Sequence, residues 1–201
     1  MTAPSFPSVS TNQEKYLSYK AQMARLKKAR AEGFYLEAIF ILYAMLEDRL
    51  SAFLYHAGAT NNTREKLTTN KQVRKHLDQI SLKPNQNVKK ISAKVSLMKT
   101  LICWSDVYTP EEASKTYPDL LCKQLRRSAR KDEIVQSLED IEAWCGTRNE
   151  LVHALLKKRL EDQEEALIAL VERGLGYCRC FDNFVDSFKL RNTLRRQFNI
   201  Q

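Results

Sequence analysis

The chain has little of what a β-rich protein needs. Only 5 glycines and 5 prolines occur among 201 residues, so the turns that join short strands are scarce and long helices are favoured. The sequence shows no internal repeat or low-complexity array, which argues against a solenoid or propeller. With 43% hydrophobic and 28% charged residues, the composition is that of a globular protein whose length suits one domain.

Export and membrane signals are also missing. The first residues, MTAPSFPSVSTNQ, lack the basic start and apolar stretch of a signal peptide, and no later segment stays uncharged for the length of a membrane span. The five cysteines are an odd set without framework spacing, which fits reduced thiols. In CRC at 178–180, two cysteines two apart on a helix diverge, so packing is favoured over metal binding. We expect a cytoplasmic protein without a cofactor.

The positive charge is concentrated in one part of the chain. The formal net charge is +9, and residues 64–131 hold 16 Lys/Arg but only 6 Asp/Glu. Lysines and arginines that replace condensed counterions give sequence-independent affinity for RNA. The alternative is a solvated basic surface that keeps the protein soluble. Charge alone does not separate these two interpretations.

Helical periodicity runs through most of the sequence. We expect a flexible tail over 1–11, an amphipathic helix over 12–32 that ends or bends at Gly33, and a second, unusually apolar helix over 34–56. An almost wholly apolar helix must be covered in a bundle or by another chain. Its deepest face is expected at Ile39, Tyr43, Leu46, Leu50 and Phe53.

The remaining segments complete a single helical domain over 12–201. A basic helical insertion is expected at about 58–131, with Asn70 capping one helix and an apolar stripe at Val88, Ile91, Val95, Met98 and Ile102 in another. A last helix should run from 161 to 198, with Gly174 and Gly176 as bends. The prediction is an all-α bundle of about five to seven helices.

The segment TRNELVH at 147–153 combines three groups suited to phosphate chemistry. If Thr147 and Glu150 form a capping box, a helix restarts here and presents free N–H groups to an anion. If one helix continues from Asp132, Arg148 falls on the apolar stripe. In both cases Arg148 faces a protein or cleft surface and is expected to need an anionic partner.

The same groups fit attack of an RNA 2′-hydroxyl on the neighbouring phosphate. His153 could transfer the proton, Arg148 could hold the charge that develops on phosphate oxygens, and Asn149 could orient either, without a metal. The plainer interpretation is that His153 is an ordinary surface or core histidine, which is the commoner role of a histidine in a helix.

At this point the sequence resembles the HEPN domain family (higher eukaryotes and prokaryotes nucleotide-binding). Ribonuclease members carry an Arg, four to six residues and a His, often with Asn directly after the Arg, and RNELVH matches this spacing. The order of elements is also similar, with an apolar early helix, AIFILYAMLEDRL, then a variable middle, the motif helix and a long closing helix. The resemblance covers about half the chain and leaves the basic middle unaccounted for.

The resemblance implies a metal-independent endoribonuclease whose two motif copies meet in a homodimer cleft, so that acid and base come from different chains. Such proteins serve as toxins, phage-defence effectors or RNA-processing enzymes, and some pair with an antitoxin or a nucleotidyltransferase. Other members lack catalytic activity and act only by binding. The alternative function is therefore a non-catalytic helical module that binds RNA or a partner protein.

Several other residues are assigned expected roles. Glu47 is a candidate to support Arg148 or the histidine, whereas Asp48 is expected in a surface ion pair. His56 and His76 are expected on the surface. With few aromatic residues in the basic region, we expect RNA binding through the backbone and no base-stacking platform. The expected RNA-binding residues are Lys89, Lys90, Lys94, Lys99, Arg126, Arg127 and Arg130.

Overall fold

The structure is a computed structural model that describes residues 12–80, 87–128, 131–154, 157, 163–190 and 194–200. The helices are α1 (Asn12–Ala31), α2 (Tyr35–His56), α3 (Lys71–Ile80), α4 (Ile91–Val107), α5 (Tyr117–Arg127), α6 (Lys131–Ala154), α7 (Glu164–Leu190) and α8 (Leu194–Gln197). Within these ranges the only β pairing is an isolated bridge between Thr60 and Leu67. The all-helical bundle is confirmed, and the expected tail over 1–11 lies outside the described residues.

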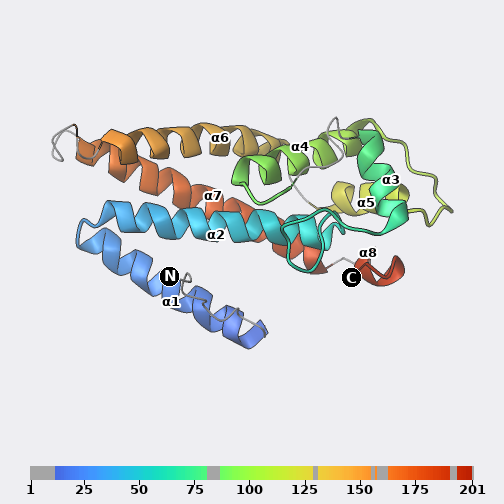
Figure 1. Cartoon of the computed structure of the whole chain (residues 1–201), viewed down its shortest axis with the longest axis horizontal. Coiled ribbons are helices and arrows are strands. Elements are labelled where there is room, and N and C mark those ends of the chain that lie inside the picture. The colour runs from blue at the N-terminus through green and yellow to red at the C-terminus, as the bar shows by residue number, and fades with distance from the viewer. Residues whose placement is uncertain are drawn as a thin grey trace, which may run out of the picture.

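The helices α1, α2, α6 and α7 extend along the molecule, whereas α3, α5 and α8 gather at one end (Figure 1). The helix α2 packs against α1, α4 and α7, while α6 packs against α4 and α7. The helices α3, α5 and α8 form the compact end, with α5 in contact with α3, α4 and α8. The described residues of the expected closing helix comprise α7 and α8, which brings the helices in the described ranges to eight, one more than expected.

Burial of α2 explains its unusual sequence. Ile39, Leu46, Leu50 and Phe53 are at most 1% exposed, as expected for the deepest face. Tyr43 differs, because it is only partly buried and lies at the edge of the core. Burial of each large aliphatic or aromatic side chain contributes roughly 1.5–3 kcal/mol. This helix is therefore the central element of the bundle.

The expected end of α1 is confirmed, although one of its aromatic residues does not pack as expected. Gly33 has φ +76°, and Phe34 N–H donates to the Ala29 carbonyl at 2.7 Å, which is the hydrogen bond of a Schellman cap. A side chain at this φ would be strained, so glycine fits the position. The helical spacing of Tyr16, Tyr19, Met23 and Leu26 predicts that all four pack against the bundle, but Tyr16 is 66% exposed.

The basic middle of the chain is part of the bundle. Asn70 caps α3, because its Oδ1 accepts the N–H groups of Gln72 and Val73 at 3.1 and 3.2 Å. In α4 the expected apolar stripe from Val88 to Ile102 is buried, and this helix packs against both α2 and α6. The expected insertion therefore contributes to the same core and does not form a separate layer.

Residues near the end of the sequence close the corner between α2 and α3. Gly58 has φ +75°, and a Cβ placed on it would lie 2.5 Å from Ile200 Cδ1. Asn70 Nδ2 donates to the Phe198 carbonyl at 2.7 Å. Arg195 donates to the Tyr55 and Thr60 carbonyls, both at 3.0 Å. The segment 194–200 is thus bound to the turn after α2.

The two glycines expected as bends both lie inside the uninterrupted helix α7, in different surroundings. Gly174 is buried, and a Cβ there would lie 3.0 Å from Trp144 Cζ2 and 3.1 Å from Leu42 Cδ1. The Trp144 ring is fixed by its own hydrogen bond to the Leu170 carbonyl at 2.8 Å. Gly176 is exposed, and a Cβ at this residue would meet no atom within 4 Å. Gly174 therefore allows close approach of three helices.

This difference predicts opposite effects of the same substitution. Gly176→Ala should raise the free energy of unfolding by roughly 0.5–1 kcal/mol, because alanine is the better helix former and no atom opposes it. Gly174→Ala should instead lower the free energy of unfolding, since overpacking a core costs about 1–3 kcal/mol, which exceeds the gain in helix propensity. Urea unfolding of both variants tests this. Equal stabilisation by the two alanines would contradict the packing argument.

Candidate functional site

The RNELVH motif lies on the last turns of an unbroken helix. The helix α6 continues through Gly146 to Ala154, and Thr147 Oγ1 donates to the Ala143 carbonyl at 3.1 Å. The capping-box alternative is therefore wrong, because Thr147 bonds to its own preceding turn and the chain does not begin a new helix there. Arg148 instead projects toward α2, as the continuous-helix alternative predicted.

Arg148 has an aromatic partner where an anion was expected. Its Cζ lies 4.0 Å from the centroid of the Tyr43 ring, and its Nε and Nη2 donate to Asn149 Oδ1 at 3.2 and 2.5 Å. Within the described ranges no carboxylate forms an ion pair with Arg148. A cation over an aromatic face is stabilised while keeping its full charge. Within the described residues, therefore, no carboxylate serves as the anionic partner expected for Arg148.

The neighbours of Arg148 do not neutralise it. Burial raises the pKa of Tyr43, an effect that the nearby Arg148 charge opposes. Burial also raises the pKa of the Cys145 thiol to about 11, again against the Arg148 charge. Both groups are therefore neutral at pH 7. The half-buried guanidinium remains available to an anion from outside the chain.

Tyr43 is the site residue that the sequence analysis did not identify. It was assigned to the deepest core face, yet it is half-buried beneath Arg148. Its place on α2 gave one signal, since it lies one helical turn before the candidate residue Glu47. The pairing with α6 could not be read from periodicity, because it joins two helices that are distant in the sequence.

His153 lies at the exposed end of α6. It is one turn after Asn149 on the same helix face, whereas its position differs from that of Arg148 by about 140° around the axis. Within the described part of the chain, no hydrogen bond joins His153 to Arg148 or Asn149. The structure thus brings Arg148 and Asn149 together and leaves His153 apart, facing solvent.

Glu47 is held by a lysine of α4. Lys94 Nζ lies 2.7 Å from Glu47 Oε1, and the side chains are 7% and 35% exposed, respectively. Glu47 therefore lies one turn from Tyr43 but does not bind Arg148. Lys94, expected to contact RNA, is 5% exposed and points inward to this carboxylate, so it is not part of any RNA-binding surface.

The other expected RNA-binding residues are distributed unevenly. Lys89 and Lys90 are exposed at the start of α4, and Lys89 lies 3.6 Å from Glu65. Lys99 forms an ion pair with Glu139, with 2.5 Å between Lys99 Nζ and Glu139 Oε1. Arg126 donates to the Ser105 and Tyr108 carbonyls at the end of α4, which is a structural role. Arg127 is exposed, and Arg130 lies outside the described residues.

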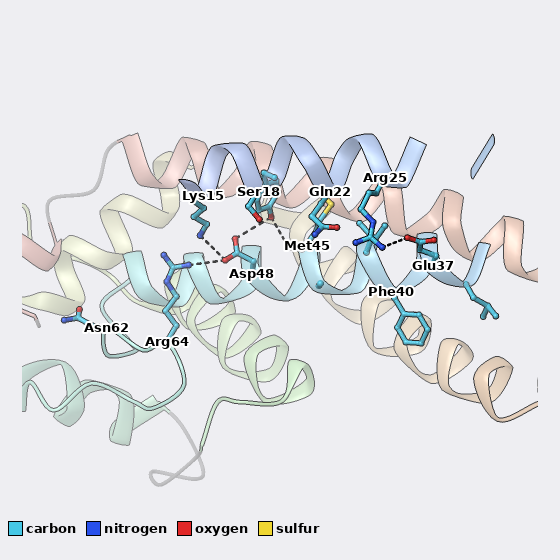
Figure 2. Close-up of a pocket in the computed structure, with 14 residues that line it drawn as sticks. Lys15, Ser18, Gln22, Arg25, Glu37, Phe40, Met45, Asp48, Asn62 and Arg64 are labelled. Atoms are coloured by element: carbon cyan, nitrogen blue, oxygen red, sulfur yellow. Dashed lines mark hydrogen bonds and ion pairs between the residues drawn. The ribbon is translucent and has the colours of Figure 1, made fainter. Parts of the chain in front are cut away.

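A groove with a volume of about 900 Å³ lies between α1 and α2 (Figure 2). Its charged groups bind one another across the groove, with Lys15 and Arg64 at 2.9 and 3.3 Å from Asp48. Arg25 pairs with Glu37 at 2.6 Å. The ion pairing expected for Asp48 is present. Both carboxylates that line the groove are thus bound by lysine or arginine side chains of the same groove.

His56 and His76 were expected on the surface, but both side chains are buried or partly buried. His76 is 5% exposed, with its ring 4.4 Å from that of Trp104. Burial lowers the pKa of His76 to about 4. His56 is half-buried, and burial, followed by the charges of Lys189 and Arg64, lowers its pKa to about 4. Both rings are therefore neutral at pH 7.

These histidines predict acid sensitivity. Because their pKa values are near 4 in the folded chain and about 6.5 in the unfolded chain, the unfolded chain binds more protons between pH 6.5 and 4. Stability is complete above pH 6.5 and is lost as pH falls, by up to about 1.4 kcal/mol per pH unit for each ring. His76→Phe should make this dependence shallower in denaturant titrations at pH 7, 6 and 5. If the free energy of unfolding of His76→Phe changed with pH as steeply as that of the wild type, the lowered pKa of His76 would be contradicted.

The CRC segment packs as the sequence suggested. Cys178 is 5% exposed, its Sγ lies 3.6 Å from the Leu42 carbonyl, and burial raises its pKa to about 12. Cys180 Sγ instead lies 3.7 Å from Ser137 Oγ. Among the residues that the structure describes, no group of three His, Cys, Asp or Glu side chains is placed to hold a metal ion.

Comparison with protein-family models, curated proteins and solved structures finds no match to this chain. In the described part of the chain, none of the helices has the length and hydropathy needed to cross a bilayer.

Proposed function

We propose that the chain is a metal-independent endoribonuclease of HEPN type that acts as a homodimer. The observation that supports this best is Arg148, a half-buried guanidinium at the protein surface with a tyrosine ring beneath it and no carboxylate bound to it within the described residues. Such a group is suited to a phosphate, which can accept two parallel hydrogen bonds from the planar fork. Asn149 lies against the same guanidinium, and His153 is one turn away.

The proposed reaction is an internal transfer at phosphorus. The 2′-oxygen of RNA attacks the adjacent phosphorus, the bond to the 5′-oxygen breaks, and the products carry a 2′,3′-cyclic phosphate and a 5′-hydroxyl. One His153 accepts the proton of the 2′-hydroxyl, and a second His153 donates a proton to the departing oxygen. Arg148 stabilises the charge on the phosphate oxygens, and Asn149 holds the guanidinium in place.

A second copy of the chain is required because one chain offers one motif histidine. The surface of α2 beside the motif is apolar and uncovered, since Phe40 is 53% exposed and Ala44 is also exposed. Phe40 points away from α1 (Figure 2). Pairing two such faces would bury apolar area and bring the two α6 ends together. Lys89, Lys90 and Arg127 then remain exposed to hold the RNA backbone.

The proposed setting is that of a toxin or phage-defence effector, with an antitoxin or nucleotidyltransferase as its neutralising partner. The competing proposal is a non-catalytic module that binds RNA or a protein. Its support is that His153 and Arg148 are not in contact within one chain.

Incubation of the purified protein with structured RNA in EDTA tests the proposal. We expect cleavage products with cyclic-phosphate ends and a dimer by analytical ultracentrifugation. Arg148→Lys is the matched variant, because it keeps the charge and loses the fork, so it should cleave much more slowly while remaining folded. A confirmed dimer that cleaves none of several RNAs would favour the binding module.

A further inference from the structure

A pocket of about 490 Å³ lies at the compact end of the molecule, between α3 and the start of α5. This volume falls in the range of small-molecule sites, roughly 300–1,000 Å³. The pocket is separate from the motif at the end of α6, and its lining residues have no part in the proposed cleavage. It comprises residues of α3, the segment 115–118 and Phe198.

Two lysines give the pocket an uncompensated positive charge. Lys75 on α3 and Lys115 before α5 both line it, both are exposed, and neither forms an ion pair with a carboxylate of the described residues. The nearest acid along α3, Asp78, is already bound to Arg74 at 3.0 Å. Two like charges on facing walls repel each other, and an anion between them would relieve that repulsion.

The start of α5 borders the pocket but does not add to this charge. Thr116 and Pro118 line the pocket at the N-terminus of this helix, and no side chain caps the helix through Thr116. Pro118 has no N–H group to donate. The Asp119 carboxylate in the same turn accepts hydrogen bonds from Tyr108, Ser114, Thr116 and the Glu111 N–H group, and its negative charge offsets the positive end of the helix dipole. The preference for an anion therefore rests on Lys75 and Lys115.

Flat rings form the rest of the wall. Phe198 is partly exposed and lies 5.7 Å from Tyr117, which lies 5.6 Å from His76, measured between ring centroids. His76 lines the pocket, is 5% exposed, and its Nε2 has no hydrogen-bond partner within the described chain. Gln72 and Gln79, also in the lining, supply amide donors and acceptors.

From this arrangement we infer that the pocket binds a nucleotide, with the phosphate between Lys75 and Lys115 and the base against Phe198. Lysine ammonium groups suit the phosphate, an aromatic wall suits the base, and glutamine amides suit the base edge. The nucleotide can be free or part of an RNA strand, and the chemistry of recognition is the same. This site would revise the expectation that RNA binding lacks an aromatic contact.

Binding can be measured without any cleavage. The Trp104 ring packs edge-on against His76, with 4.4 Å between the ring centroids, and reports on the pocket by fluorescence, while the second tryptophan, Trp144, is buried in the bundle. The probes are AMP, inorganic phosphate and a 2′-O-methyl hexa-adenylate, which has no free 2′-hydroxyl and cannot be cut. A negative result here would therefore leave the proposed ribonuclease activity untouched, and the reverse is also true.

We expect saturable binding of AMP or of the oligonucleotide. The double variant Lys75→Ala/Lys115→Ala should weaken it at least tenfold, while the matched control Lys20→Ala, exposed on α1, should not change it. Phe198→Leu should weaken nucleotide binding several-fold and leave phosphate binding unchanged. Tighter binding of the oligonucleotide than of AMP would identify an RNA strand, and the opposite order a free nucleotide. Absence of saturation at millimolar concentrations, or equal binding by the double variant, would overturn the inference.

Discussion

Replacement of His153 with alanine is expected to slow RNA cleavage by about 10²–10⁴-fold, the usual contribution of a positioned acid or base. The fold should be unchanged, because His153 is exposed at the end of α6. Arg148→Ala should slow cleavage by about 10²–10³-fold through the loss of charge stabilisation. Initial rates on one RNA, with circular dichroism to monitor folding, provide the measurement.

Mixing experiments sharpen this prediction. If each reaction uses one His153 from each chain, a randomly mixed dimer is active only when both chains are wild type. Activity should then fall as the square of the wild-type fraction, so that equal mixing with His153→Ala chains leaves about one quarter. A linear fall to one half would show that each chain acts alone, and the shared-histidine mechanism would have to be abandoned.

The second large effect concerns the ion pair between α2 and α4. Glu47→Ala should lower the free energy of unfolding by roughly 3 kcal/mol, because it leaves the Lys94 ammonium, 7% exposed, without its carboxylate. Replacement of both groups, Glu47→Leu with Lys94→Met, should restore most of that loss, since apolar residues can substitute for a buried ion pair. Denaturant unfolding of the two variants gives the comparison.

A surface pair from the same helix provides the control. Lys99 and Glu139 are 41% and 49% exposed, so Glu139→Ala should cost less than about 1 kcal/mol. The double variant also separates structure from catalysis. If Glu47→Leu/Lys94→Met folds and cleaves RNA at the wild-type rate, Glu47 has no supporting role in the reaction. If Glu47→Ala and Glu139→Ala lowered the free energy of unfolding by the same amount, the argument from the buried ion pair would be contradicted.

The sequence predicted the elements governed by local rules. Gly33 ends α1 and Asn70 caps α3, because a left-handed turn and a short polar side chain act on backbone groups only a few residues away. The stripe of α4 is buried because a 3.6-residue period places it on one face. These features depend on neighbours in the sequence, so a single chain suffices to predict them.

Partners in space were not predictable in the same way. Arg148 was expected to meet an anion and meets Tyr43, and Lys94 was expected to meet RNA and meets Glu47. His76 lies in a basic, polar segment, yet it is buried against Trp104. Each of these contacts joins different helices, and helical periodicity does not determine which side chain of a neighbouring helix is reached.

Residues 194–200 cover the turn after α2, and this affects the chain during its synthesis on the ribosome. The hydrogen bond from Asn70 to Phe198 joins residues 128 positions apart. At typical rates of synthesis, about 5–20 residues per second, the corner waits roughly 6 to 26 s for its cover to emerge from the ribosome. During that interval the turn after α2 lacks its contact with Ile200, and Tyr117, once made, lacks its contact with Phe198. A nascent chain of this protein should therefore be a substrate for chaperones until residues 194–200 have emerged.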